Sequence, residues 1–488
     1  MQEEGVYLHQ VIDSLENQLD RSMKISRLRA SNVHGYLPIA VKFFEDLTFL
    51  TGLNGSGKTS ALRLLMALLT PNIEELGSID FSEASIDVKD GDQNITVSAT
   101  RDSDRIIVSI STQASSLIIS TAEIQLLMDV RRREEPRAPI LEKYSSDPVV
   151  TAIKAISTPM FLGLDRRFFS PSGFGEDPTE ARRREMLSRR LWSEDPNVRE
   201  SGVRSLMEAN YLVFSKLQEV RAKQESLDDT LRTQFYSKAF EYKPVDILGQ
   251  KARLPSKNEL DAYRKQMEKI ERAAEGYKIP VPEIQSALTH FFSRMSDVVT
   301  SMDKAPRPVD KRHGKKISNK DTFLVPPDKN YIEWIINRPQ VDRILEHLKL
   351  LEEYIERRDA LRDPINRFLT LVNSFLAQTD KVVSVSDSGQ LEVSPRGGRG
   401  KPISALSSGE RQLLVMLAHL SLNPSLAHSG VFIVDEPELS LHIDWQEKFV
   451  DAIQEANPKV QIILATHSPA IVLDRIDSCR ALNEAEDA

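Results

Sequence analysis

The sequence predicts an α/β fold in which a parallel sheet is interrupted by a long helical insertion. Two largely apolar runs, Val431 to Val434 and Gln461 to Leu464, predict strands that are buried on both faces. A third apolar run, Leu47 to Leu50, is followed by a glycine-rich turn and by a helical pattern from Ser60 to Leu69. Strand, turn and helix in this order are typical of α/β proteins.

The turn after Leu50 has the pattern of a phosphate-binding loop, G-x-x-x-x-G-K-[ST]. Its glycines let backbone N–H groups point at phosphate oxygens, and the N-terminus of the following helix adds its dipole. We expect Lys58 to neutralise the β- and γ-phosphates of ATP and the Thr59 hydroxyl to ligate Mg²⁺. The predicted nucleotide-binding residues of this loop are Asn54, Gly55, Ser56, Gly57, Lys58, Thr59 and Ser60.

Two carboxylates stand at the end of the strand predicted at Val431 to Val434. Ligands of open α/β sheets collect at the carboxyl ends of the strands. We therefore expect Asp435 to hold Mg²⁺ and Glu436 to orient or deprotonate the attacking water. Adjacent acids after a strand are also common in solvated turns, but the phosphate loop favours the catalytic interpretation.

The segment Leu406 to Gln412, with the sequence Leu-Ser-Ser-Gly-Glu-Arg-Gln, precedes a predicted apolar helix. It resembles the signature sequence of the ATP-binding-cassette (ABC) superfamily. There, nucleotide is bound between the phosphate loop of one protomer and the signature of another. The resemblance implies a head-to-tail homo-oligomer, at minimum a dimer, in which Ser407, Gly409 and Glu410 complete a neighbour's site. The same residues also fit an ordinary helix start, with Ser407 as N-cap and Glu410 in the first turn.

Other parts of the superfamily pattern are matched less fully. His467, directly after the strand predicted at Gln461 to Leu464, lies where the superfamily keeps the switch histidine that contacts the γ-phosphate. Leu439 to His442 matches the segment that crosses the dimer interface, although His442 replaces the aspartate that many members have there. The glutamine expected before the helical subdomain is missing, and Asp165 to Arg167 stand in its place.

Most of the chain separates Lys58 from Ser407, far more than the compact helical subdomain of a transporter ATPase would need. Alternating segments within 24–50 and 79–120 predict an antiparallel sheet beside the phosphate loop. The charged helical patterns that follow lack a persistent heptad, so they favour a helical lobe or folded arm over a long coiled coil. The predicted domains are an N-terminal helix at 1–21, an N-terminal ATPase lobe at 22–170, a helical insertion at 171–379 and a C-terminal ATPase lobe at 380–488.

This order of segments resembles the RecF, SbcC and OLD-like ATPases. It resembles more closely the ATPases of bacterial anti-phage defence systems, most of all PtuA of Septu, with AriA of PARIS and retron-associated ATPases as close alternatives. The resemblance rests on the signature segment and on the run from Asp435 to Gln446. It implies an ATPase subunit that oligomerises, senses infection and controls a separate effector, such as an HNH nuclease in Septu. A DNA-repair ATPase acting directly on DNA is the alternative, and the spacing disfavours a transporter.

Composition and length indicate where the protein is located and which partners it can bind. No apolar stretch approaches the ~20 residues of a membrane span, and the single cysteine, Cys479, leaves no pair for a disulfide or a zinc site. We expect a cytoplasmic protein without membrane contact and, since the chain ends soon after His467, without the Toprim nuclease of OLD proteins. Because the net charge is −8, nucleic acid would need a local patch. The basic clusters at 182–190 and 304–320 are candidates, or else solvated surface.

Overall fold

The computed structural model describes residues 23–53, 55–130, 143–144, 146–156, 159–163, 168–169, 201–241, 329–395, 398–426, 430–439 and 441–483, with scattered residues between 265 and 301. The chain divides into two compact units. The first comprises Met1–Gln218 and Pro364–Ala488, and the second is Glu219–Asp363. The predicted N-terminal helix, both basic clusters, Asn54, Ser440 and Asp165 to Arg167 lie outside the described residues.

The first unit is built on a six-stranded sheet in the order β15-β3-β14-β13-β8-β9. Its pairs are parallel except for β8 with β9. Every residue of β13 and β14 is buried, which confirms the strands predicted from their apolar sequences. The strands are β3 (Leu47–Thr51), β8 (Met160–Leu162), β9 (Phe168–Phe169), β13 (Val431–Asp435), β14 (Gln461–Ala465) and β15 (Cys479–Ala481).

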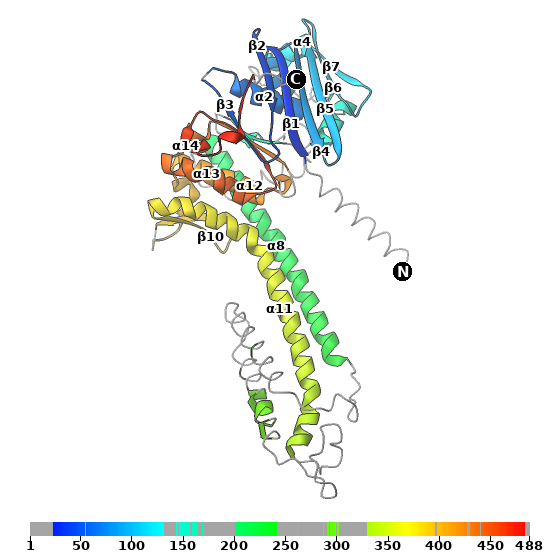
Figure 1. Ribbon diagram of the computed structural model, residues 1–488, viewed down its shortest axis with the longest axis vertical. Helices are drawn as coiled ribbons and strands as arrows, with labels where there is room; N and C mark the ends of the chain where they lie inside the picture. Colours follow the sequence, from blue (N-terminus) through cyan, green and yellow to red (C-terminus); the bar gives the residue numbers. More distant parts are fainter. Residues whose placement is uncertain are drawn as a thin grey trace. The chain divides into compact units, whose positions relative to one another are not determined.

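A second, antiparallel sheet has the order β2-β1-β4-β5-β6-β7, as the alternating sequence predicts (Figure 1). Helix α2 (Lys58–Leu69) packs against β1, β4 and β5 of this sheet and against β13 of the first. One apolar core therefore spans both sheets. The strands are β1 (Met23–Val33), β2 (Leu37–Lys42), β4 (Glu83–Asp90), β5 (Gln93–Arg101), β6 (Arg105–Ile110) and β7 (Ser116–Ser120), and the nearby helices are α3 (Ile73–Ser78), α4 (Thr121–Val130) and α6 (Pro148–Ala155).

Gln461, at the start of β14, ties the two sheets together. Its side chain is fully buried. The amide oxygen accepts from the backbone N–H of Ile25 at 2.7 Å, and the amide nitrogen donates to the carbonyl oxygens of Ile25 and Phe44 at 2.8 and 2.6 Å. A buried amide with its hydrogen bonds satisfied fixes how two elements meet. The parallel sheet is thereby held in place against the N-terminal sheet.

The C-terminal part of the first unit carries three further helices and a small sheet. The segment from Ser386 to Gly389 is typical of a hairpin turn, and the strands on either side of it pair antiparallel, with Gly389 at a φ of +84°. The helices are α12 (Ser408–Leu422), α13 (Ile443–Ala456) and α14 (Pro469–Val472), the strands are β10 (Lys381–Val385), β11 (Leu391–Pro395) and β12 (Lys401–Pro402), and the 3-10 turns are η3 (Ala377–Thr379), η4 (Ile403–Ala405), η5 (Pro424–Leu426), η6 (Pro437–Leu439) and η7 (Ile476–Ser478).

Two long helices, α8 (Ser201–Phe240) and α11 (Lys329–Leu376), make up most of the described insertion. Within the second unit they run antiparallel. Tyr354 donates to Asp228 at 2.6 Å, the ring of His347 lies 4.1 Å from that of Phe235, and Arg343 donates to the carbonyl oxygen of Glu241. The large helical insertion expected from the sequence is confirmed, with continuous helices of 40 and 48 residues. In the described part of the chain, no helix combines the length and apolarity needed to span a membrane.

Candidate nucleotide-binding site

The register of the parallel strands brings the predicted site residues to one edge of the sheet. Leu50 of β3 is the partner of Ala465 in β14, and Ala465 is the partner of Asp435 in β13. Beyond the strands, Glu436 donates its backbone N–H to the carbonyl oxygen of Ala465 at 2.8 Å. The phosphate loop, the acidic pair and His467 therefore leave three adjacent strands at the same end.

The phosphate loop folds around the buried side chain of Lys58. Its ammonium donates to the carbonyl oxygens of Gly52 and Leu53, at 2.8 and 3.2 Å. Gly57, the N-cap of α2, has a φ of +97°, and a Cβ there would collide with the side chain of Leu37. Both backbone and packing thus require glycine at this position. No side chain caps α2, so its first N–H groups are not taken up by a capping side chain, and their binding of a phosphate stays a prediction.

The remaining loop residues are placed as follows. Gly55 has a φ of +84° in an open position, and the Ser56 hydroxyl is buried without a hydrogen-bond partner among the described residues. The Ser60 hydroxyl is hydrogen-bonded to Nε2 of His34 at 2.8 Å. Ser60 is thus held by its own subunit, and its contact with nucleotide stays a prediction.

Asp435 and Thr59 form the candidate metal site. Asp435 is buried, and neither of its carboxylate oxygens has a hydrogen-bond partner at ordinary distance in the described part of the chain. Burial raises the pKa of Asp435, while the neighbouring Thr59 hydroxyl and Lys58 ammonium act in the opposite direction. Orphaned carboxylate oxygens next to a hydroxyl are hard oxygen donors of the kind that Mg²⁺ prefers. The residues present fit the predicted metal.

Glu436 has an unusual backbone. Its φ is +49°, a left-handed conformation that strains a non-glycine residue by about 1–3 kcal/mol. Such strain is concentrated at functional sites, where it fixes the direction of a side chain. Among the described residues, the half-buried Glu436 carboxylate has neither a hydrogen bond nor an ion pair. This carboxylate remains available for a water molecule, as the catalytic interpretation requires.

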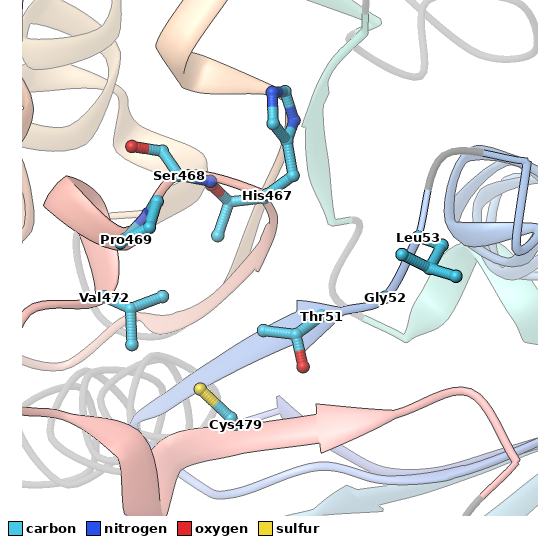
Figure 2. A pocket seen from close by; sticks show the side chains of 9 residues that line it. Thr51, Gly52, Leu53, His467, Ser468, Pro469, Val472 and Cys479 are labelled. Atoms are coloured by element: carbon cyan, nitrogen blue, oxygen red, sulfur yellow. The ribbon is translucent and has the colours of Figure 1, made fainter.

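A cavity of ≈ 710 Å³ opens between the phosphate loop and the segment that follows β14 (Figure 2). Figure 2 shows Leu53 and His467 on opposite sides of the opening, with Cys479 of β15 below them. The start of the phosphate loop and the segment that contains His467 therefore line the same cavity. Its lining residues are Thr51, Gly52, Leu53, Thr466, His467, Ser468, Pro469, Val472 and Cys479.

Glu438 is part of this edge, although the sequence did not single it out. Its buried carboxylate contacts Thr466 and His467, as described below. The available signal was a third acid two residues after Glu436, but an acid in that position is also common in a turn. Only the pairing of β13 with β14 shows that Glu438 faces His467.

The signature segment begins α12 as a complete capping box. The hydroxyl of Ser407 accepts from the N–H of Glu410, and the Glu410 carboxylate accepts from the N–H of Ser407. Glu410 is buried, and both of its oxygens accept from the Lys381 ammonium, at 2.9 and 2.8 Å. Within one subunit these residues and Gly409, in the first turn, therefore build the helix start. Their contact with a neighbour's nucleotide stays a prediction.

The ion pair between Lys381 and Glu410 should stabilise the signature. Burial would raise the pKa of Glu410, but hydrogen bonds from Lys381 and Ser407 outweigh it and keep that pKa below its usual value. We expect Lys381→Met to lower the free energy of unfolding by about 1–3 kcal/mol at pH 7. Because the folded-state pKa is depressed, this difference should persist above the ordinary pKa of glutamate and disappear as pH falls through the folded-state pKa.

Urea unfolding of Lys381→Met and wild type at several pH values between 3 and 8 measures this difference. Lys401→Met, an exposed lysine of the same small sheet, is the matched control and should have no such effect. Equal stability of Lys381→Met and wild type at pH 7 would show that the pair contributes nothing.

The interface-crossing segment is described only in part. Leu439 is 56% exposed, and His442 serves as the N-cap of α13, where its Nδ1 accepts from the N–H of Asp444 at 3.5 Å. His442 is itself exposed, so capping does not remove it from the surface. Its role between subunits stays a prediction.

The fold and this strand edge define a phosphate-loop ATPase domain of the ABC type. The chain belongs to the family described as an AAA domain, whose model matches residues 27–288, more than half of the chain. A second family model matches residues 301–474. Its description names an AAA domain, the AbiEii toxin and type IV toxin–antitoxin systems.

Curated relatives include a retron ATPase, a Septu protein and a DNA-repair ATPase. The protein named Retron Vc95 probable ATPase, from Vibrio cholerae serotype O1 biovar El Tor, is 26% identical over 30% of this chain and 31% of its own length. The Septu protein PtuA of Bacillus thuringiensis is 42% identical over 12% of this chain and 16% of its own. The DNA double-strand break repair Rad50 ATPase of Saccharolobus solfataricus is 36% identical over 18% of this chain and 10% of its own. These matches span less than a third of each relative's length.

Proposed function

We propose that the chain is the ATP-hydrolysing subunit of an anti-phage defence complex, in which it oligomerises and controls a separate effector. The observation that carries the hydrolytic part is the strand edge, where an unpaired acid, an orphaned metal ligand and an uncapped helix N-terminus follow adjacent strands. The similarity to the retron and Septu proteins supports the defence part.

Each residue has a distinct part in the proposed reaction. The amides at the start of α2 and the Lys58 ammonium bind the phosphates, and Thr59 and Asp435 hold Mg²⁺. Mg²⁺ held by these two residues would supply charge neutralisation at the phosphates. Glu436 orients a water molecule and accepts its proton, and His467 contacts the γ-phosphate. Ser407 and Gly409 of a neighbouring copy complete the site from the opposite side.

The effector is proposed to be a different polypeptide, such as an HNH nuclease. In this arrangement, ATP binding joins two copies of the chain, and the change in assembly releases or restrains the effector. Nucleic acid contact through the basic clusters at 182–190 and 304–320 is a further proposal, because both clusters offer phosphate-binding side chains.

Activity measured with and without the neighbouring gene tests this assignment. We expect the purified chain to release phosphate from ATP in the presence of Mg²⁺ but not of EDTA, and not to cut DNA or RNA by itself. In cells, protection against phage should need both the chain and the product of an adjacent effector gene. Metal-dependent nucleic acid cleavage by the chain alone, lost on a mutation outside the ATP site, would contradict the division of labour.

A DNA-repair ATPase is the second candidate, and the match to Rad50 favours it. In that case DNA should stimulate ATP hydrolysis by the chain alone, and deletion of the gene should sensitise cells to double-strand breaks. Protection against phage would then be absent. The same purified protein and the same deletion strain therefore separate the two candidates.

A further inference from the structure

One carboxylate oxygen of Glu438 contacts several polar groups of the segment that follows β14. Glu438 lies in η6, two residues after Glu436, and its side chain is only 6% exposed. Its Oε1 accepts from the Thr466 hydroxyl at 2.8 Å and from the backbone N–H of His467 at 2.8 Å. The same Oε1 lies 2.9 Å from Nδ1 of His467. Backbone and ring of the histidine are thus bound to a single atom.

This contact determines which ring nitrogen carries the proton. An ionised carboxylate only accepts hydrogen bonds, so the nitrogen that faces it, Nδ1, must be protonated. In the neutral ring, Nε2 then has a free lone pair and is directed away from Glu438. The His467 side chain is 46% exposed and borders the cavity beside the phosphate loop (Figure 2).

The same network fixes the backbone around His467. The hydroxyl of Thr466 accepts from the N–H of Ser468 at 3.0 Å, and Ser468 donates to the side chain of Gln446 at 2.7 Å. Gln446 in turn donates to the carbonyl oxygen of Leu441 at 2.9 Å. The chain leaving β14 is therefore connected to the chain leaving β13 through hydrogen bonds on both sides of the histidine.

The two glutamates after β13 consequently differ in what their carboxylates do. Glu436 has no bound partner in the described part of the chain, whereas Oε1 of Glu438 is committed to Thr466 and His467. The second oxygen of Glu438 is buried and has no hydrogen bond to any described residue.

We infer that Glu438 is a positioning residue for His467: its carboxylate holds the imidazole as the Nδ1–H tautomer and turns Nε2 toward the nucleotide. Glu438 is therefore not a second general base. The inference rests on the proposed ATPase function for its kinetic consequences. The tautomer itself is a property of the protein without nucleotide.

The kinetic test combines substitutions at both positions. Glu438→Ala should lower kcat by about 10–100-fold, as for other residues that orient a functional histidine, with little change in the affinity for nucleotide. In a His467→Ala background, Glu438→Ala should cause almost no further loss, because the residue acts through the histidine. Glu438→Gln keeps an acceptor oxygen and should retain more activity than Glu438→Ala. Glu447→Ala, an exposed acid on α13, is the control.

A spectroscopic test does not depend on turnover. In ¹⁵N-histidine-labelled protein, the His467 ring signals are assigned by their loss in His467→Ala. We expect Nδ1 to be the protonated nitrogen of the neutral ring in wild type and Nε2 in Glu438→Ala. A wild-type ring protonated at Nε2 would overturn the inference.

The possible failures are distinguishable. Equal fractional losses of kcat from Glu438→Ala with and without His467 would assign a merely structural role and also overturn the inference. If wild type does not hydrolyse ATP, the proposed function fails, while the tautomer measurement still decides whether Glu438 orients the ring. If wild type hydrolyses ATP and Glu438→Ala does so at the same rate, the positioning role is refuted while the proposed ATPase function stands.

Discussion

Glu436→Gln is expected to lower kcat for ATP hydrolysis by about 10²–10⁴-fold while the protein still binds ATP. The amide preserves the size and shape of the side chain but cannot take the proton of the attacking water. The strained backbone of Glu436 should accept glutamine at the same φ of +49°. Binding depends instead on the phosphate loop, so Lys58→Ala should weaken ATP affinity and Glu436→Gln should not.

Phosphate release and equilibrium binding of a fluorescent ATP analogue measure these two effects separately. Glu447→Gln, which makes the same chemical change on the exposed surface of α13, should behave as wild type. Turnover at the wild-type rate in Glu436→Gln would remove Glu436 from the mechanism. Loss of binding together with hydrolysis would instead indicate that the substitution disturbs the strand edge.

The second large effect concerns the sharing of one site by two subunits. Ser407→Arg should block hydrolysis almost completely, because a bulky cation replaces the small hydroxyl that faces a neighbour's γ-phosphate. Mixing it with Lys58→Ala should restore activity. Each mixed dimer then has one intact site, so random pairing of equal amounts recovers about a quarter of the wild-type sites.

Ser407→Ala separates this effect from the loss of the helix cap. The Ser407 hydroxyl caps α12, so either substitution should lower stability by about 1 kcal/mol. Only the arginine should also block the neighbour's site. Absence of recovery over a range of mixing ratios, with mixed oligomers confirmed by differently tagged subunits, would place the complete site within one chain.

The sequence was sufficient for the elements whose signals are local. The phosphate loop is recognisable because Gly57, Lys58 and Thr59 must be adjacent to wrap a phosphate, and β13 because four consecutive apolar residues are buried on both faces. The hairpin around Gly389 is recognisable for a similar reason, since its turn needs a residue with positive φ.

Contacts between distant segments were not predictable in the same way. Glu438 meets His467 across 29 positions, and only the register of β13 with β14 places them together. Glu410 could be predicted as a capping residue from its spacing to Ser407, but its ion pair with Lys381 depends on how the small sheet packs against α12. The domain boundaries also depend on contacts between distant segments, and the boundaries given above remain predictions.

The strand order of the parallel sheet also determines when its strands can pair during translation. β3 carries the phosphate loop, yet both of its neighbours, β14 and β15, come from the last part of the described chain. Until those residues have left the ribosome, β3 has two unpaired edges, and the fully buried Phe49 lacks its final environment. Exposed strand edges promote pairing with other chains. The nascent protein is therefore exposed to aggregation through β3 until β14 and β15 have been made, and the strand edge that carries the candidate nucleotide site forms only then.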